Sequence, residues 1–379
     1  MASPKPNSVV ESLPPTVPFL APEVLERRSG RAIKLRLGAN ESVFGMSSRA
    51  RQAVLETIDR IAWYADPENF VLREKLAGLL RIGMENIVIG SGIDDLLGLM
   101  VRVFLEPGGK AVASLGSYPT FRYHVEGYGG QMCSVPYREV WNHLDALAET
   151  AKRVNAQMVY LANPDNPTGT FYEAKELQRF QEKIPAECLL LLDEAYAEYA
   201  PQQDLLPLDA NAPGVVRLRT FSKAYGMAGA RIGYGIASLE KIQAFDKVRL
   251  HFGVNKFAQE AAAAALDDQE FIAYATRAVA EGREDYYKLA RELGLRFVPS
   301  STNFVLLDMQ TPEQARFLLN RLLEEGIFIR MPNAPPLDHY VRVTVGTPEE
   351  RRGFAEAMRR LVRTGVISVK EPGAVAVKS

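Results

Sequence analysis

A short segment in the second half of the chain combines a lysine with a hydroxyl side chain and an arginine. Lys223 directly follows Ser222, and Arg231 comes eight residues later, after a segment with two glycines and three alanines. A lysine amine can form a Schiff base with a carbonyl compound, and a hydroxyl and a guanidinium can hold phosphate oxygens. The segment therefore predicts a site for a carbonyl cofactor that carries a phosphate, although an isolated lysine is more often an exposed surface residue.

An acidic residue at the end of an apolar run is a second candidate. Asp193 follows four consecutive leucines, 189–192, which are typical of a buried strand. A carboxylate in that position needs a partner, because an isolated charge is costly to bury. A protonated pyridine nitrogen would be such a partner, and its hydrogen bond would keep the ring able to accept electrons. A helix N-cap and an ion pair with a nearby arginine are equally open alternatives.

Two loops add polar and backbone groups. The segment 163–169, N-P-D-N-P-T-G, contains two prolines and a glycine, which predict a rigid turn. Such a turn can present the amide of Asn166 as a fixed donor to a phenolate oxygen. The segment 90–95 places glycines between a predicted strand and a predicted helix, where backbone amides can approach a phosphate. Each loop taken alone is also compatible with a plain turn, and the glycine spacing is not that of a dinucleotide site.

The pattern of apolar residues indicates how these motifs are positioned. As far as about residue 265, short apolar runs alternate with helical patterns, and the runs lie at 86–89, 111–114, 158–161, 188–192, 215–218 and 232–236. Several runs are apolar on both faces, as expected in a mostly parallel sheet covered by helices. An amphipathic helix is expected at 46–61. The lysine motif follows a predicted strand and should lie at its carboxyl end, where α/β sheets bind ligands.

The last third of the chain predicts a smaller α+β domain. Strands are expected at 304–307, 326–329 and 340–345. Thr311 and Thr347 each precede a proline and are followed three residues later by a side chain that can close a capping box, which predicts two helix starts. The expected organisation is an N-terminal arm at 1–35, a large domain at 36–265, a small domain at 266–370 and a loose tail at 371–379.

Composition limits the classes of partner. The chain has 379 residues, of which 47% are hydrophobic and 24% charged, so a globular protein of two domains is expected. A net charge of −1 argues against nucleic acid or a membrane surface as a partner, and we expect no signal peptide. Cys133 and Cys188 are expected to be free thiols of a cytoplasmic protein. The four histidines are widely spread, so no metal site is expected.

The three motifs together resemble a known family. In this order and spacing, N-P-x-N-P-T-G, D-E-A-Y and S-K-A-Y-G-M-A-G-x-R-x-G-Y are similar to the fold-type I, class I and II aminotransferases that use pyridoxal 5'-phosphate. The segments 40–41, 63–67 and 341–346 are similar to the histidinol-phosphate aminotransferase branch and its aromatic relatives. The resemblance covers almost the whole chain. It implies an α/β fold with a mostly parallel, seven-stranded type of sheet flanked by helices, together with a smaller α+β domain.

The resemblance also implies a role for each site residue. Lys223 would form the Schiff base with the cofactor and move the proton between substrate Cα and the cofactor, and Asp193 would bind the pyridine nitrogen. The other implied cofactor contacts are Asn166 and Tyr196 at the ring oxygen, Tyr118 stacked on the ring, and Ser222, Arg231 and the backbone of Gly92, Ile93 and Asp94 at the phosphate. Tyr64 would reach the phosphate of a neighbouring subunit's cofactor, which implies a homodimer.

The implied substrate residues are Asn40, Arg330, Arg342 and Phe19. Arg342 would bind a substrate carboxylate or, with Arg330, a substrate phosphate. The expected reaction is a ping-pong transfer in which histidinol phosphate gives its nitrogen to the cofactor and a 2-oxo acid, 2-oxoglutarate, takes it. An aromatic amino acid donor and a decarboxylase of the same fold are the alternatives. Phe19 stands where the branch usually has a tyrosine, and the loop 331–339 differs in composition, so both weaken the choice of substrate.

Overall fold

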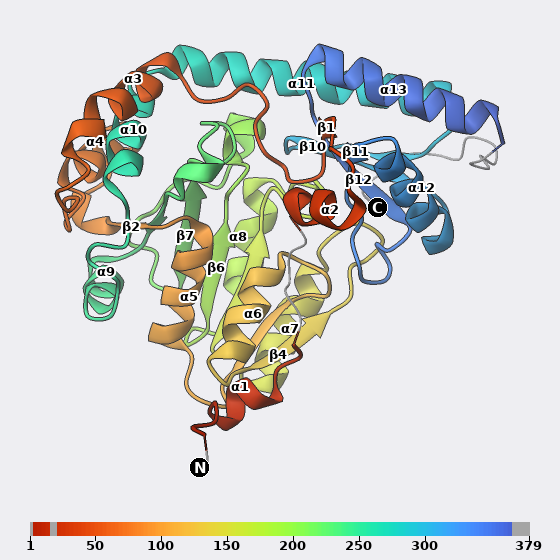
Figure 1. The fold of residues 1–379 in the computed structure, drawn as a ribbon. Coiled ribbons are helices and arrows are strands. Elements are labelled where there is room, and N and C mark those ends of the chain that lie inside the picture. The colour runs from red at the N-terminus through yellow and green to blue at the C-terminus, as the bar shows by residue number, and fades with distance from the viewer. Residues whose placement is uncertain (1–2, 16–20, 366–379) are drawn as a thin grey trace.

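A computed structural model describes residues 3–15 and 21–365, and its centre is a seven-stranded sheet in the order β2-β8-β7-β6-β5-β3-β4 (Figure 1). Among these strands only β8 runs antiparallel to its neighbours. The predicted α/β architecture with a mostly parallel sheet is therefore confirmed. The strands are β2 (Ile87–Gly90), β3 (Lys110–Ser114), β4 (Gln131–Val135), β5 (Met158–Ala162), β6 (Leu189–Asp193), β7 (Val215–Thr220) and β8 (Gly233–Ile236).

Strand order explains why the predicted motifs meet. β5, β6 and β7 are adjacent and parallel, and Asp193 at the end of β6 is in register with Ala162 and Leu218 on its two neighbours. The loop 163–170 leaves β5 and the Ser222–Lys223 segment follows β7, both at the carboxyl edge of the sheet. Ligands of open α/β sheets bind at that edge, so the site is built where the chain connections place it.

Helices bury both faces of this sheet. Along β3, Ala111 and Ala113 pack with one group of helices and Val112 packs with the other, which is the alternation that a strand imposes. One face carries α5 (Ile93–Phe104), α6 (Pro119–Gly127) and α9 (Leu239–Asp246), and the other carries α7 (Leu144–Val154) and α8 (Ala174–Lys183). A third cluster joins α3 (Ser48–Thr57), α4 (Phe70–Leu80) and α10 (Lys256–Leu266) to β2 and β8.

Two details differ from the sequence expectation. β4 was not predicted, because it is an edge strand in which only Val135 is buried and no apolar run marks it. The helix expected at 46–61 ends earlier, because α3 is followed by a single 3₁₀ turn, η1 (Ile58–Arg60), in which Ile58 is exposed. The apolar residues of that segment therefore do not all face the core.

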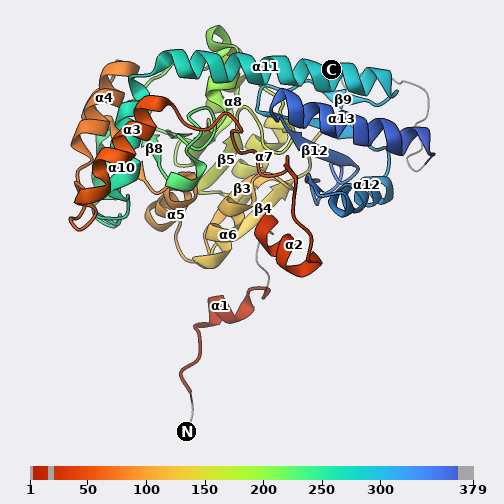
Figure 2. The same ribbon diagram turned by 45° about the horizontal axis from the view of Figure 1, so that its top comes forward.

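A smaller α+β region packs beside the large sheet. It holds the antiparallel strands β9 (Phe297–Val298), β10 (Phe304–Asp308) and β12 (Tyr340–Thr344), with α12 (Pro312–Glu324) and α13 (Pro348–Arg363). The long helix α11 (Gln269–Glu292) extends from the side of α3 and α10 to α13, as Figure 1 and Figure 2 both show. Thr347 and Glu350 form the predicted capping box, whereas at Thr311 only the threonine half forms.

The segment before the large sheet crosses to the smaller region. The expected arm contains two short helices, α1 (Ser8–Ser12) and α2 (Pro22–Ser29), and β1 (Leu35–Arg36) then pairs in parallel with β11 (Ile327–Phe328). The predicted domain boundaries stay a prediction, and the tail at 371–379 lies outside the described residues. Within residues 3–15 and 21–365, no helix combines the length and apolarity needed to cross a membrane.

Candidate active site

A cavity of about 570 Å³ lies at the carboxyl edge of the large sheet and brings most of the predicted residues together. It also reaches the smaller region, because its wall includes residues of the segment after β11 and of β12. Its lining includes Asn40, Ile93, Asp94, Tyr118, Asn166, Asp193, Tyr196, Ser222, Lys223, Arg231, Arg330 and Arg342. Within the described part of the chain, no cluster of metal-ligating side chains is found.

Asp193 forms the buried end of the cavity. Its side chain accepts hydrogen bonds from the Tyr160 hydroxyl at 2.7 Å and from the Ala195 backbone N–H at 3.0 Å. Burial raises the pKa of Asp193 to about 6. Neither of its bonding partners is charged, and no arginine or lysine of residues 21–365 forms an ion pair with it. A cationic group in the cavity would therefore stabilise this carboxylate.

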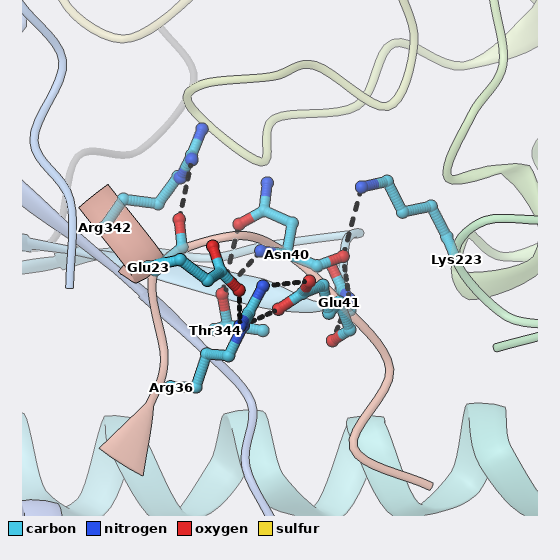
Figure 3. A network of polar contacts seen from close by, with 9 residues as sticks. Glu23, Arg36, Asn40, Glu41, Lys223, Arg342 and Thr344 are labelled. Carbon is cyan, nitrogen blue, oxygen red and sulfur yellow. Dashed lines mark hydrogen bonds and ion pairs between the residues drawn. The ribbon is translucent and has the colours of Figure 1, made fainter. Parts of the chain in front are cut away.

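Lys223 points into the cavity and is held by a backbone oxygen. Its Nζ donates to the carbonyl of Asn40 at 3.1 Å (Figure 3). The same Nζ lies 5.6 Å from the centre of the Tyr196 ring. Asn40 also donates from its side-chain Nδ2 to the Tyr196 hydroxyl at 2.9 Å. The backbone N–H of Asn40 donates to Thr344 of β12 at 3.0 Å. Thus a residue fixed on the smaller region orients both the lysine and the tyrosine of the large one.

The opposite side of the cavity has groups suited to a phosphate. The Arg231 guanidinium lies 3.5 Å from the Ser222 hydroxyl and 3.4 Å from the Asp94 carboxylate. Gly92 has φ +86°, and a Cβ there would meet the Arg231 guanidinium at 2.5 Å, so only glycine fits. Ile93 begins α5, and its N-terminal amides supply further donors. The N-terminal amides of α5, the Ser222 hydroxyl and the Arg231 guanidinium therefore fit a phosphate group.

Tyr118 lines the same cavity and contacts Asp94. Its hydroxyl donates to the Asp94 carboxylate at 2.7 Å, and burial raises the pKa of Tyr118. Tyr118 is the N-cap residue of α6, and it lines the cavity. The hydrogen bond to Asp94 fixes the orientation of the Tyr118 ring.

Two arginines come together where the smaller region meets the cavity. Arg330 and Arg342 form an antiparallel bridge through two backbone hydrogen bonds of 3.2 and 2.6 Å. The Arg342 guanidinium donates to Asn166 Oδ1 at 2.6 Å and to the Gly38 carbonyl at 3.3 Å, and its Nε is buried without a partner in the described residues. Burial lowers the pKa of Arg342 to about 10, and the Arg330 charge acts in the same direction. This end of the cavity therefore favours an anion, because two guanidinium groups lie there.

The structure adds an ion-paired cluster that sequence reasoning missed. Arg36 binds both oxygens of Glu41, at 2.7 and 2.9 Å, and also pairs with Glu23 of α2 (Figure 3). Glu41 lines the cavity and lies beside Asn40, so the cluster joins the helix α2 to the cavity wall. The segment 40–41 carries a family resemblance, but nothing in the sequence indicates that Glu41 pairs with Arg36, five positions earlier.

Three predicted residues lie elsewhere. Gly92 adjoins the Arg231 guanidinium, as described above, but does not itself line the cavity, and Phe19 lies outside the described residues. Tyr64 is 82% exposed and packs on Phe252, with 4.9 Å between the ring centres. It does not line the cavity of its own chain. Trp63 and Leu250, which are close to these two residues in the sequence, are also exposed.

Comparison with known proteins agrees with this architecture. The family model "Aminotransferase class I and II" matches residues 32–358. Histidinol-phosphate aminotransferase 2 of Carboxydothermus hydrogenoformans is 35% identical over 94% of this chain and 99% of its own length. The crystal structure of histidinol-phosphate aminotransferase from Sinorhizobium meliloti in complex with pyridoxal-5'-phosphate is 43% identical, with a TM-score of 0.92 over 96% of this chain and 99% of that one.

More distant structures share the fold alone. L-threonine-O-3-phosphate decarboxylase from Porphyromonas gingivalis matches with a TM-score of 0.75 at 23% identity, over 87% of this chain and 99% of that one. The fold therefore does not distinguish transamination from decarboxylation. The family match, by contrast, covers most of the sequence, and it includes Lys223 and both arginines of the cavity. The chain belongs to the class I and II aminotransferase family.

Proposed function

We propose that this chain is a pyridoxal 5'-phosphate-dependent aminotransferase that takes its amino group from histidinol phosphate and passes it to 2-oxoglutarate. The observation that carries the choice of donor is the apposition of Arg330 and Arg342 at one end of the cavity. The names of the relatives from Carboxydothermus hydrogenoformans and Sinorhizobium meliloti support the same donor.

The residues present fit the cofactor at both of its polar ends. Asp193 would bind the ring nitrogen, since it is a buried carboxylate without a charged partner in the described residues. Ser222, Arg231 and the N-terminal amides of α5 would hold the phosphate. Asn166 and Tyr196 would contact the ring oxygen and Tyr118 the ring face. When bound, the cofactor supplies an aldehyde for amines and a ring that withdraws electrons from substrate Cα.

Lys223 is the group that would move protons. Its amine lies in the cavity, held by the Asn40 carbonyl at 3.1 Å, and no other lysine lines the cavity in the described residues. In the proposed reaction it removes the proton from substrate Cα. Asn40 and Tyr196 orient this amine, because one accepts its hydrogen bond and the other lies beneath it.

The two arginines favour a phosphate-bearing donor. A phosphate monoester carries more negative charge than a carboxylate, so two neighbouring guanidinium groups match it better than one. The unpartnered Nε of Arg342 is a donor that an anion would satisfy. For 2-oxoglutarate the same arginine would bind a carboxylate. An aromatic amino acid donor would present a carboxylate to Arg342 and has no phosphate for the second guanidinium to bind.

The test is a single-turnover measurement of the visible absorbance of the bound cofactor. Histidinol phosphate, histidinol and phenylalanine are mixed separately with the enzyme, and Arg330→Met is measured in parallel. The proposal expects fast loss of the band only with histidinol phosphate, and an Arg330→Met effect confined to that donor. A faster reaction with phenylalanine would reassign the enzyme to aromatic substrates. Release of CO₂ from O-phosphothreonine without an aminated cofactor would indicate the decarboxylase.

We also propose that the protein acts as a homodimer in the cytoplasm. Tyr64, Trp63, Phe252 and Leu250 are exposed aromatic or apolar side chains that a second copy would cover, and Tyr64 would then reach the partner's cofactor phosphate. The free thiols Cys133 and Cys188 support a reducing compartment.

Mixed dimers test the cross-subunit role of Tyr64. One chain carries Tyr64→Phe and the other Lys223→Ala, so the site that keeps Lys223 receives an intact tyrosine from its partner. We expect normal cofactor affinity at that site. Affinity as weak as in the Tyr64→Phe homodimer would show that Tyr64 acts within its own chain.

A further inference from the structure

A second buried carboxylate lies next to the cavity and has no role in the mechanism above. Asp165 directly precedes Asn166 in the loop 163–170 and is only 1% exposed. Every group in hydrogen-bond contact with its side chain can donate. These groups are the Tyr137 hydroxyl at 3.2 Å, Asn142 Nδ2 at 2.9 Å, and the backbone N–H and hydroxyl of Thr168 at 3.1 and 2.7 Å.

These donors tie the loop to the framework of the large sheet. Tyr137 follows β4 and Asn142 precedes α7, so they come from parts of the chain distant from the loop. Asn142 Oδ1 in turn accepts from the Ser114 hydroxyl at the end of β3, at 2.5 Å. Asp165 is therefore a point at which the loop is attached to the segments that follow β4 and precede α7, and through Asn142 to the end of β3.

The other side of the loop contacts the smaller region. Asn166 Oδ1 accepts from Arg342 at 2.6 Å, and the Gly169 carbonyl accepts from the backbone N–H of Ser301 at 2.8 Å. Asn166 thus lies between Asp165, which is bonded to the large sheet's framework, and Arg342, at the substrate end of the cavity. A shift of Asp165 would be transmitted directly to the Asn166 amide, since the two residues are consecutive.

We propose that Asp165 is a positioning residue, whose buried carboxylate fixes the Asn166 amide between Arg342 and the ring oxygen of the cofactor. The proposal rests on the proposed function, because it assumes that the ring oxygen lies within reach of Asn166. A carboxylate is required for a physical reason. Asparagine has the same shape, but its NH₂ would face groups that donate, such as the Thr168 N–H, and the loop would have to move to relieve the unpaired donors.

The experiment is a double-mutant cycle on the cofactor-loaded enzyme. Asp165→Asn, Asn166→Ala and the double variant are titrated with pH while the visible band of the bound cofactor is followed, and the dissociation constant of the cofactor is measured for each. Asn166→Ala should move the pH midpoint upward by about one unit, because a ring oxygen that loses a donor holds a neighbouring proton more tightly. Asp165→Asn should move it in the same direction by a smaller amount.

The decisive result is the absence of additivity. If Asp165 acts through Asn166, then Asp165→Asn has no further effect on the midpoint in the Asn166→Ala background. Equal shifts in both backgrounds, or no shift in Asp165→Asn alone, would overturn the proposal. A wild-type enzyme that shows no visible cofactor band would instead overturn the proposed function, and this proposal with it.

A matched control separates positioning from a general loss of stability. Tyr172→Phe removes the hydrogen bond to the Asn142 carbonyl in the same cluster and leaves the four donors around the Asp165 side chain in place. It should lower the denaturant concentration at which the protein unfolds and leave the pH midpoint of the visible band unchanged. A midpoint that moves as far as in Asp165→Asn would contradict us. If Asp165→Asn fails to fold, Tyr137→Phe replaces it in the experiment, because it removes one donor to Asp165 and keeps the aromatic ring. It should shift the pH midpoint in the same direction by a smaller amount. The absence of any shift would count against the proposal.

Discussion

Replacing Asp193 by asparagine should make the cofactor-free protein more stable near neutral pH, although it damages the active site. Asp193 is buried, and its two hydrogen bonds, from Tyr160 and from the Ala195 N–H, come from uncharged groups. An asparagine can keep both contacts, because its oxygen accepts from the backbone N–H and the Tyr160 hydroxyl can rotate to accept from its NH₂. The substitution therefore removes a charge with little loss of bonding.

The size and the pH window follow from the pKa. Burial raises the pKa of Asp193 from its ordinary value of 3.8 to about 6, so the folded protein binds this proton more tightly than the unfolded chain. The stability that the protonated form gives is present below pH 4 and is lost as the pH rises through about 6. Above that pH, keeping the carboxylate ionised costs about 3 kcal/mol. The Asp193→Asn variant would not carry this cost.

The assay is chemical unfolding of both cofactor-free proteins at one protein concentration, at pH 8 and at pH 4. The variant should be more stable by up to about 3 kcal/mol at the higher pH, and the difference should disappear at the lower pH. Added pyridoxal 5'-phosphate should oppose this advantage, because under the proposed role of Asp193 the wild-type protein would bind it more tightly. Each hundredfold difference in affinity contributes about 2.7 kcal/mol at saturation.

Two outcomes would refute this reasoning. Equal stability of the cofactor-free proteins at pH 8 would mean that Asp193 is not penalised by burial there. A difference that does not change between pH 8 and pH 4 would mean that a contact, rather than the titration of Asp193, controls stability.

Three further predictions follow from the site and the fold. Lys223→Ala should abolish the visible band of the cofactor and turnover, since no other lysine lines the cavity in the described residues; retained turnover would reject the assignment. Arg342→Lys should raise KM for 2-oxoglutarate about tenfold or more in steady-state assays, because a point charge replaces a fork; an unchanged KM would contradict it. Thr347→Ala should lower the unfolding free energy by about 1 kcal/mol, and Thr311→Ala by less, because only Thr347 has the complete capping box. Denaturation of the two variants under identical conditions checks this, and equal losses would count against it.

The central strands were predictable because burial on both faces leaves a mark in the sequence. The four leucines before Asp193 occupy β6, and each side chain is buried on one face or the other. β4 leaves no such mark, since an edge strand with partly exposed side chains needs no apolar run. β1 and β9 have two residues each, too few to show any alternation.

The candidate site was predictable where a motif follows a strand. Lys223, Asp193 and Asn166 meet because the strands before them are adjacent and parallel. The Arg36 cluster was not predictable, because its ion pairs join α2 to the cavity wall through tertiary contacts alone. Asp165 was overlooked because an aspartate between two prolines is explained by turn formation, and only the structure shows donors from two distant segments around it.

The pairing of β1 with β11 means that the two halves of this protein cannot be separated by a single cut. A fragment that began near residue 266 would lack β1 and leave an open edge on β11. It would also lack Asn40, which lies on the same segment as β1 and donates a hydrogen bond from its backbone N–H to Thr344. Any rotation of the smaller region relative to the large sheet would carry Asn40 with it, away from the Lys223 amine. The position of the Lys223 amine is therefore coupled to the relative placement of the two regions through one carbonyl oxygen.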